Sequence, residues 1–276
     1  MTSNPRKLDG LARPDDDKPP VLLVHGMWST DETLHELRDA FAQEGYPVTA
    51  LRLPYHCPKA EHTEVTRAKL ARARLEDYVG CIVEAVQKQQ SPPILVGHSM
   101  GALLAQLTAA RVPCERLILL SSAAPAGING WGLSVFRTLG ANLLRFPMWE
   151  RVTEIGLKNI RYGVANAQSP ALQEEIFDST TYESGMATFQ ISMGPILRSR
   201  SAAHVQVERI QCPVLIIGGT EDRITPIRIQ RSIAKRFGDQ ATTVEIKGCC
   251  HWTIAGKHFP QIRSALFHWL EARAKA

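Results

Sequence analysis

The sequence predicts an α/β protein: a doubly wound, mostly parallel sheet of about six strands, flanked by helices and carrying a helical cap insertion. Short apolar runs alternate with segments of helical periodicity, and most of these runs are almost continuously apolar. Such runs are typical of parallel strands that are covered on both faces, and helical crossovers between them produce a doubly wound sheet. The strand pattern stops between Pro125 and about Gln206, which indicates the insertion.

The expected elements follow in a βα order. We expect strands over 21–24, 48–53, 94–96, 117–120, 214–217 and 243–246, and helices over 31–43, 66–90 and 100–111. Thr225 and Pro226 indicate the N-cap and first turn of a further helix. The polar residues 1–18 are expected to form a flexible tail. Residues 19–125 and 207–276 are assigned to the core, and residues 126–206 to a helical cap.

Composition and charge exclude several classes of protein. The chain has 276 residues, of which 44% are hydrophobic and 21% charged, so it can bury a large core. Lysine and arginine exceed the acidic residues by 32 to 27, and because the excess is spread along the chain we expect no nucleic-acid partner. No apolar run reaches the length of a membrane span, and the N-terminus lacks the apolar core of a secretion signal. A cytoplasmic protein is therefore expected.

The six cysteines show no CxxC pair and no zinc-binding spacing, and a domain of this size needs no disulfides. We therefore expect reduced thiols, no metal and no cofactor. A soft-metal site is an alternative, built from Cys249, Cys250, His56, Cys57 and His62. We prefer the interpretation that the two adjacent thiols pack beneath a histidine loop.

Polar residues follow four of the predicted strands at their carboxyl ends, where doubly wound sheets hold their functional sites. These are His25-Gly26, Gly97-His98-Ser99 and the segments 218–222 and 248–251. The chemistry is therefore expected at one edge of the sheet.

Gly97, Ser99 and Gly101 form a Gly-x-Ser-x-Gly motif between a predicted strand and a predicted helix. A serine in such a sharp turn has a strained backbone that lifts its hydroxyl above the sheet, and the glycines avoid collisions there. Because the helix N-terminus points at Ser99, the backbone N–H of Met100 is a candidate donor to an oxyanion. The motif predicts a nucleophilic serine.

A serine hydroxyl is a weak nucleophile near neutral pH, so it needs a base, and the base needs an acid to orient it. Asp222 follows the predicted strand 214–217, and His251 follows the predicted strand 243–246. The alternatives are Glu221, or an N-cap role, for the acid, and His204, His258 or His268 for the base. His251 is preferred because it directly follows a predicted strand at the correct end of the sheet, and Asp222 because it stands ahead of the Ile-Thr-Pro turn, a position implied by the family resemblance given next.

With these motifs the chain resembles the α/β-hydrolase superfamily, in particular serine hydrolases of the esterase and lipase kind with an inserted cap. The resemblance extends from about Pro19 to the C-terminal helix. The order serine, aspartate, histidine is the order of that fold. Larger members begin with an antiparallel hairpin, whose place is taken here by the polar tail, so a shortened sheet of six strands is implied.

The resemblance also implies roles around the first strand. His25 and Gly26 would shape the first loop, and the backbone N–H of Met27 would be the second oxyanion donor. His25 and His98 lie inside the motifs, and we expect them to pack and to orient loops without taking part in the chemistry.

The resulting hypothesis is a serine hydrolase that cleaves a small or medium carboxylic ester through an acyl-enzyme. Thioesterase or acyltransferase, lactonase, amidase and carbon–carbon hydrolase activities use the same residues and stay open. A non-catalytic receptor for a small ligand is a further alternative. The expected partner is a small acyl molecule, and the sequence specifies neither its identity nor an oligomeric state.

Overall fold

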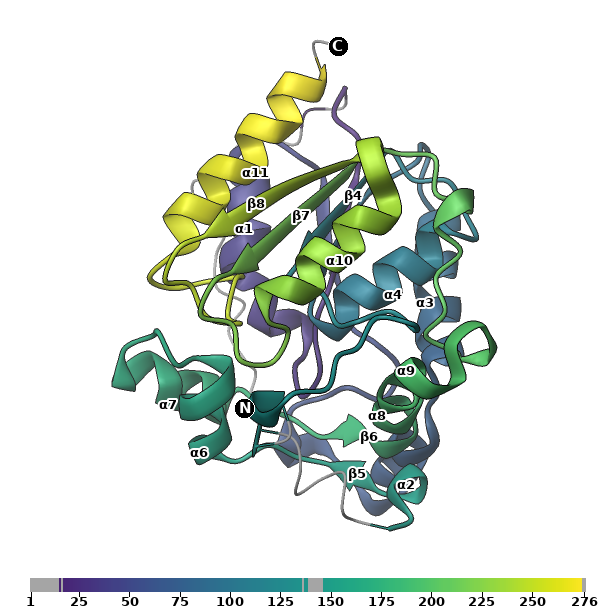
Figure 1. The fold of residues 1–276 in the computed structure, drawn as a ribbon, viewed down its shortest axis with the longest axis vertical. Coiled ribbons are helices and arrows are strands. Elements are labelled where there is room, and N and C mark those ends of the chain that lie inside the picture. Colours follow the sequence, from purple (N-terminus) through teal and green to yellow (C-terminus); the bar gives the residue numbers. More distant parts are fainter. Residues whose placement is uncertain (1–14, 16, 136, 139–145, 275–276) are drawn as a thin grey trace, which may run out of the picture.

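The computed structural model describes residues 15, 17–135, 137–138 and 146–274, and a central sheet with helices packed against it dominates the picture (Figure 1). Most of the predicted tail lies outside the described residues, as do positions 136 and 139–145 of the predicted cap. All strand pairs of the main sheet are parallel. In sheet order the strands are β2 (Val48–Leu51), β1 (Val21–Val24), β3 (Ile94–His98), β4 (Arg116–Leu120), β7 (Val214–Gly219) and β8 (Ala241–Ile246).

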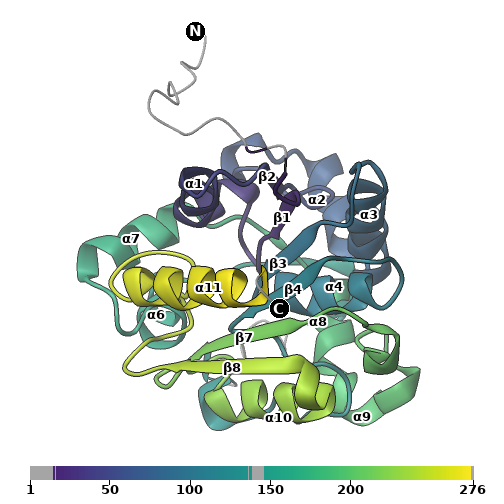
Figure 2. The ribbon, with the colours of Figure 1, turned by 90° about the horizontal axis from the view of Figure 1, so that it is seen from above.

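The predicted fold class, a parallel sheet of six strands flanked by helices, is confirmed. Side chains alternate along each strand, so that Leu22 contributes to one apolar layer and Leu23 to the other. Figure 2 shows α1 and α11 on one side of the sheet and α3 and α4 on the other. The helices that supply buried side chains to these layers are α1 (His35–Gln43), α3 (Leu75–Gln87), α4 (Met100–Ala109), α10 (Ile227–Phe237) and α11 (Phe259–Ala274).

The strand register brings the carboxyl ends of neighbouring strands level with one another. Val24 of β1 pairs with Gly97 of β3, and His98 of β3 pairs with Leu120 of β4. The chain beyond β4 continues the pattern, because the N–H of Ser121 donates to the carbonyl of Ile217 at 2.8 Å. The loops that follow β1, β3 and β7 therefore begin at the same edge of the sheet.

The connection between β4 and β7 holds most of the elements outside the sheet layers. Its helices are α6 (Leu157–Asn159), α7 (Pro170–Asp178), α8 (Gly185–Ser192) and α9 (Gly194–Leu197). It also contains an antiparallel pair, β5 (Val152–Thr153) and β6 (Glu183–Ser184). The sequence did not predict this pair, because two residues per strand leave no periodic pattern.

The predicted helix over 66–90 is wrong as a single element. The structure has two helices, α2 (Glu64–Arg72) and α3, separated by extended backbone at Ala73 and Arg74. The backbone groups freed at the break find side-chain partners: Ser184 donates its hydroxyl to the carbonyl of Ala73 at 2.6 Å, and Gln190 accepts from the N–H of Leu75 at 2.8 Å. Partners from β6 and α8 thus offset the loss of helical hydrogen bonds.

Replacing Ser184 by Ala tests this account of the break. The substitution removes a donor to a buried carbonyl and also the N-cap of α8, where the Ser184 hydroxyl accepts from the N–H of Ala187. We expect a loss of about 2 kcal/mol in the free energy of unfolding, measured by urea denaturation. Ser169→Ala is the matched control, because this serine caps the exposed start of α7 and supports no helix break. It should cost about 1 kcal/mol, and equal costs for the two variants would contradict the account.

Candidate functional site

Ser99 lies in the turn between β3 and α4, with backbone angles φ 55° and ψ −119°. This is a left-handed region that a serine rarely adopts. A Cβ at Gly97 would collide with the backbone of Gly101, and a Cβ at Gly101 would collide with the carbonyls of Val24 and His25. The two glycines are therefore required for the close approach of β1, β3 and α4 that creates the turn.

The structure brings Ser99, His251 and Asp222 together. The Oγ of Ser99 lies 2.9 Å from Nε2 of His251, and Nδ1 of His251 lies 2.8 Å from Oδ2 of Asp222. All three residues are buried. With Nδ1–H donating to the carboxylate, Nε2 is left to accept from the serine hydroxyl. This arrangement can remove a proton from Ser99 and stabilise the imidazolium that forms.

Asp222 is held as a carboxylate by its surroundings. Its Oδ1 accepts from the N–H groups of Ile224 and Thr225, both at 2.8 Å, and its Oδ2 also accepts from the Thr225 hydroxyl at 2.9 Å. Burial acts to raise the pKa of Asp222, but the His251 ring and the backbone donors outweigh it and hold that pKa below its usual value.

Thr225 has a different place from the one predicted. The N-cap of α10 is Pro226, and the helix begins at Ile227. The Thr225 hydroxyl lies beside the acid and base, 2.9 Å from Oδ2 of Asp222 and 3.2 Å from Nδ1 of His251. The N–H of Thr225 and its hydroxyl thus face the carboxylate of Asp222, and the side-chain oxygen does not cap α10.

His98 is buried beside the loop that carries His251, with the centroids of the two rings 5.1 Å apart. Its Nε2–H donates to the carbonyl of His251 at 3.0 Å. Burial, reinforced by the His251 ring, lowers the pKa of His98 to about 3. The ring is therefore neutral at pH 7 and supports the backbone that carries His251.

His25 fixes the peptide that precedes Met27. Its Nε2 accepts from the N–H of Leu53 at 3.2 Å, which leaves Nδ1–H to donate to the carbonyl of Gly26 at 2.9 Å. Burial, and then the neighbouring His56 ring, lower the pKa of His25 to about 3, so the His25 ring stays neutral at pH 7. Since the C=O and N–H of a trans peptide point in opposite directions, the N–H of Met27 is turned away from the His25 ring.

The alternative acid and bases lie elsewhere. Glu221 is exposed and its backbone, not its carboxylate, bonds to Cys249 and Asn166. His268 is an exposed residue of α11. The hydrogen bonds of Ser99 and Asp222 involve neither this histidine nor His204 nor His258.

The residues of the alternative metal site take other partners. Cys249 and Cys250 are buried beside His251, while His56 bonds to Glu183 and His62 to Thr181. Over the described part of the chain, no group of three or more His, Cys, Asp or Glu side chains is placed to hold a metal ion.

A small apolar pocket of about 90 Å³ opens at Ser99. Its wall comes from the first loop, from the chain after β4 and from the start of α10. The residues that line it with Ser99 include Met27, Ala123, Trp131, Val135, Ile191 and Ile229. A flexible apolar group attached to a carbonyl fits this lining better than a charged one does.

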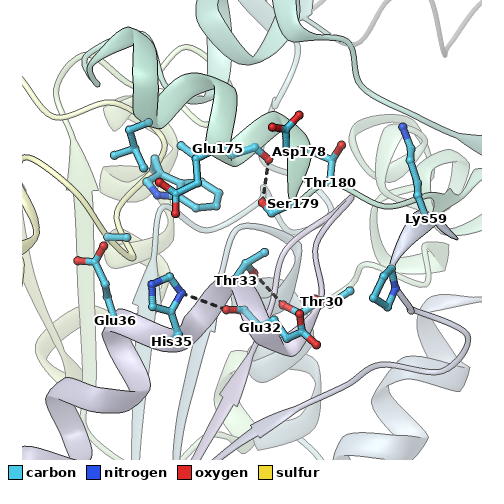
Figure 3. Close-up of a pocket in the computed structure, with 15 residues that line it drawn as sticks. Thr30, Glu32, Thr33, His35, Glu36, Lys59, Glu175, Asp178, Ser179 and Thr180 are labelled. Atoms are coloured by element: carbon cyan, nitrogen blue, oxygen red, sulfur yellow. Dashed lines mark hydrogen bonds between the residues drawn. The ribbon is translucent and has the colours of Figure 1, made fainter. Parts of the chain in front are cut away.

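A second cavity, of about 350 Å³, lies between the start of α1 and the end of α7 (Figure 3). Its wall includes several acidic side chains: Figure 3 shows Glu32, His35 and Glu36 on one side and Glu175, Asp178 and Ser179 facing them. Trp252 lines it, but Ser99 and His251 do not. This cavity is therefore not the place where Ser99 could meet a substrate.

Sequence reasoning missed a buried cluster next to His25. Nε2 of His56 lies 3.1 Å from Oε2 of Glu183 and its Nδ1 lies 3.1 Å from the carbonyl oxygen of Pro54, and Tyr78 donates to Glu183 at 2.9 Å. Burial acts to raise the pKa of Glu183, but His56 and the other donors hold it below its usual value. The cluster joins β6 to the loop after β2 and to α3. In the sequence its members are polar residues far apart along the chain, so no local pattern indicates it.

The protein is thus an α/β protein with a parallel sheet. At the carboxyl edge of this sheet a serine, a histidine and a carboxylate are aligned by hydrogen bonds. The profile of the alpha/beta hydrolase family matches residues 21–267. The chain belongs to this family, which confirms the resemblance noted in the sequence.

Similar proteins include two lipases and an esterase. The thermostable monoacylglycerol lipase of Bacillus sp. (strain H-257) is 27% identical over 209 residues, which cover 75% of this chain and 71% of that lipase. The monoacylglycerol lipase of Paleococcus ferrophilus superposes with a TM-score of 0.68 at 22% identity, over 92% of this chain and 95% of that one. Polyneuridine aldehyde esterase superposes with a TM-score of 0.65 at 16% identity, over 91% and 98%.

The buried neutral histidines predict a pH dependence of stability. The pKa of His25 and that of His98 are each about 3 in the folded protein, against about 6.5 in an unfolded chain. The unfolded chain therefore binds these protons first, so the stability is fully present above pH 6.5 and is lost as the pH falls toward 3. Between pH 7 and 5 each histidine should lower the free energy of unfolding by about 2 kcal/mol.

Urea denaturation at pH 7 and pH 5 measures this dependence. His98→Gln should remove about 2 kcal/mol of the change between the two pH values. His35→Gln, on an exposed residue of α1, is the control and should leave the change intact. The same pH dependence in wild type and His98→Gln would contradict the assignment of a neutral buried ring.

Proposed function

We propose that this protein is a serine hydrolase that cleaves a small or medium carboxylic ester through an acyl-enzyme. The observation that carries the proposal is the alignment of Ser99, His251 and Asp222, at 2.9 Å and 2.8 Å, at the mouth of an apolar pocket. Ser99 attacks the ester carbonyl while His251 takes its proton. His251 then gives that proton to the leaving alcohol, and Asp222 orients and stabilises the imidazolium.

Water completes the reaction. His251 removes a proton from a water molecule that attacks the acyl-enzyme, and returns it to Ser99 as the acid product leaves. In both halves a negative charge develops on the former carbonyl oxygen. We propose that the backbone N–H groups of Met27 and Met100 bind this oxygen.

Two features support these donors. Met100 is the first residue of α4, where helical N–H groups have no partner within the helix and the helix dipole favours negative charge. Met27 lines the Ser99 pocket, and Gly26 packs close enough that an added Cβ would lie 3.1 Å from the Cβ of Ser99. The two amides belong to loops that follow different strands, β1 and β3, and both loops lie beside Ser99.

The apolar lining of the pocket favours an acyl chain, and the named relatives include monoacylglycerol lipases and an esterase. Thioesters, lactones, amides and certain carbon–carbon bonds present the same carbonyl to the same residues, so they belong in a substrate panel beside monoacylglycerols. A receptor that only binds its ligand would have no use for a base within 2.9 Å of the serine hydroxyl.

We also propose that residues 126–206 form a cap over Ser99. Gly130, Trp131, Val135, Ile191 and Pro195 from this range line the Ser99 pocket, which supports that role.

No helix in the described part of the chain is both long and apolar enough to cross a membrane. The six cysteines are free, which agrees with the proposed cytoplasmic location.

Ser99→Ala is the direct test. We expect it to lower kcat for a short-chain p-nitrophenyl ester by about 10⁴-fold or more, and to abolish labelling by a fluorophosphonate, because no other group can form the acyl-enzyme. Ser264→Ala, on an exposed serine of α11, is the matched control and should keep both properties. Turnover by Ser99→Ala at the wild-type rate, or tight binding of an intact ester without turnover by the wild type, would overturn the proposal.

A further inference from the structure

Trp28, the residue after Met27, has a backbone that needs an explanation. Its φ is 56°, a conformation that is a genuine outlier for a bulky side chain and that is strained. Trp28 is only 6% exposed, so water does not hold it in place. The surrounding structure must therefore fix this conformation.

Two hydrogen bonds fix it, and both come from the chain between β4 and β7. The indole Nε1–H donates to the hydroxyl of Thr153 on β5 at 3.1 Å, and the Trp28 carbonyl accepts from the N–H of Thr181 at 2.8 Å. Thr153 pairs with Glu183 of β6, and both threonines are buried. β5 thus holds Trp28 by its side chain, and the segment just before β6 holds it by its backbone.

On the other side of Met27, His25 fixes the carbonyl of Gly26 from the core. The amide proposed to bind the oxyanion therefore lies between two anchors: His25 at the end of β1, and the contacts of Trp28 with Thr153 and Thr181. We infer that Trp28 and Thr153 are positioning residues that set the direction of the Met27 N–H. This inference rests on the proposed function and adds that the proposed cap orients the oxyanion donor as well as lining the pocket.

Trp28→Phe and Thr153→Val each remove the indole bond and keep most of the side-chain shape. Because the oxyanion forms only in the reaction, we expect kcat for a p-nitrophenyl ester to fall by roughly ten- to a hundred-fold, less than the loss of a whole oxyanion donor, while KM changes little. The affinity for an alkyl boronic acid, which forms a tetrahedral adduct with a serine, should fall by the same factor as kcat/KM. Since both substitutions remove the same hydrogen bond between Trp28 and Thr153, the double variant should be no slower than the slower single variant.

The chain supplies a matched control. Trp269 of α11 donates its indole N–H to the hydroxyl of Thr242 on β8 at 3.0 Å, at the opposite end of the strand from the histidine loop. Trp269→Phe and Thr242→Val remove the same kind of bond, so they should lower the unfolding temperature in the same way but keep kcat within about twofold of wild type.

The outcomes separate this inference from the function it rests on. If Ser99→Ala is inactive and Trp28→Phe and Thr153→Val keep the wild-type kcat and boronate affinity, the serine hydrolase proposal stands and the positioning role is overturned. If the loss in kcat of the double variant equals the product of the two single losses, the two side chains act independently. That result would overturn the claim that they act through their shared hydrogen bond. Activity in Ser99→Ala would overturn the function itself.

A second observation, independent of the first, concerns Cys114 and Cys212. Their Sγ atoms lie 3.2 Å apart, closer than two sulfur atoms in ordinary contact. Cys114 precedes β4 and Cys212 precedes β7, and the pairing of these strands from Leu117 and Val214 fixes the two ends side by side. Both cysteines line a surface groove, so reagents can reach them.

We propose that Cys114 and Cys212 are an oxidation site at which a peroxide forms a disulfide. Hydrogen peroxide oxidises one thiolate to a sulfenic acid and releases hydroxide, and the second thiol attacks the sulfenic sulfur as water leaves. In total two thiols lose two electrons and two protons, and the peroxide becomes two molecules of water. The hydrogen bond from Cys114, partly opposed by burial, lowers the pKa of Cys212, which favours it as the first thiolate.

Peptide mapping by mass spectrometry after treatment with hydrogen peroxide tests the site. We expect a cross-linked peptide that contains both cysteines, two fewer titratable thiols and a higher unfolding temperature, because the bond closes a long loop of the unfolded chain. Cys114→Ser should show none of these changes, and Cys81→Ser should show all of them. A disulfide elsewhere, such as between Cys249 and Cys250, or sulfinic acid without a cross-link would overturn the proposal.

Discussion

The packing of two glycines against neighbouring backbone governs the geometry of the site. Gly101 brings α4 against the carbonyls at the end of β1, and Gly97 lets β3 pass beneath the same helix. Ser99 can then keep its left-handed conformation, because its N–H donates to Leu120 at 3.0 Å and its carbonyl accepts from Ala123 at 3.0 Å. The strain of the turn is offset by bonds to β4 and to the chain beyond it, so the position of the hydroxyl depends on the whole sheet.

Much of this arrangement could be predicted from the sequence because it depends on local pattern. Strands that are covered on both faces are apolar throughout, and the residues that follow them in a parallel sheet are brought to one edge whatever the lengths of the crossovers. For that reason the sequence placed Ser99, Asp222 and His251 at the same edge, and the structure has them within hydrogen-bond distance. The glycines of the serine turn likewise reflect a backbone conformation that few other residues allow.

The features that the sequence did not predict depend on partners far along the chain. The break between α2 and α3 requires Ser184 and Gln190, whose side chains replace helical hydrogen bonds. The charge of Glu183 is stable in the core because His56, Tyr78 and the N–H of Ser184 meet it there. No periodicity records such pairs, because each partner taken alone is an ordinary polar residue in a loop or helix.

The strands β4 and β7 are direct neighbours, so the chain leaves the sheet and returns to it at adjacent positions. In evolution the segment between these strands can change length at little entropic cost, and the pairing of β4 with β7 would stay the same. Yet this segment supplies an acceptor to Trp28 and a carboxylate to His56. A different segment inserted here could change the pocket. It would also have to supply an acceptor for Trp28 and a carboxylate for His56, so these two polar contacts limit how the segment can vary.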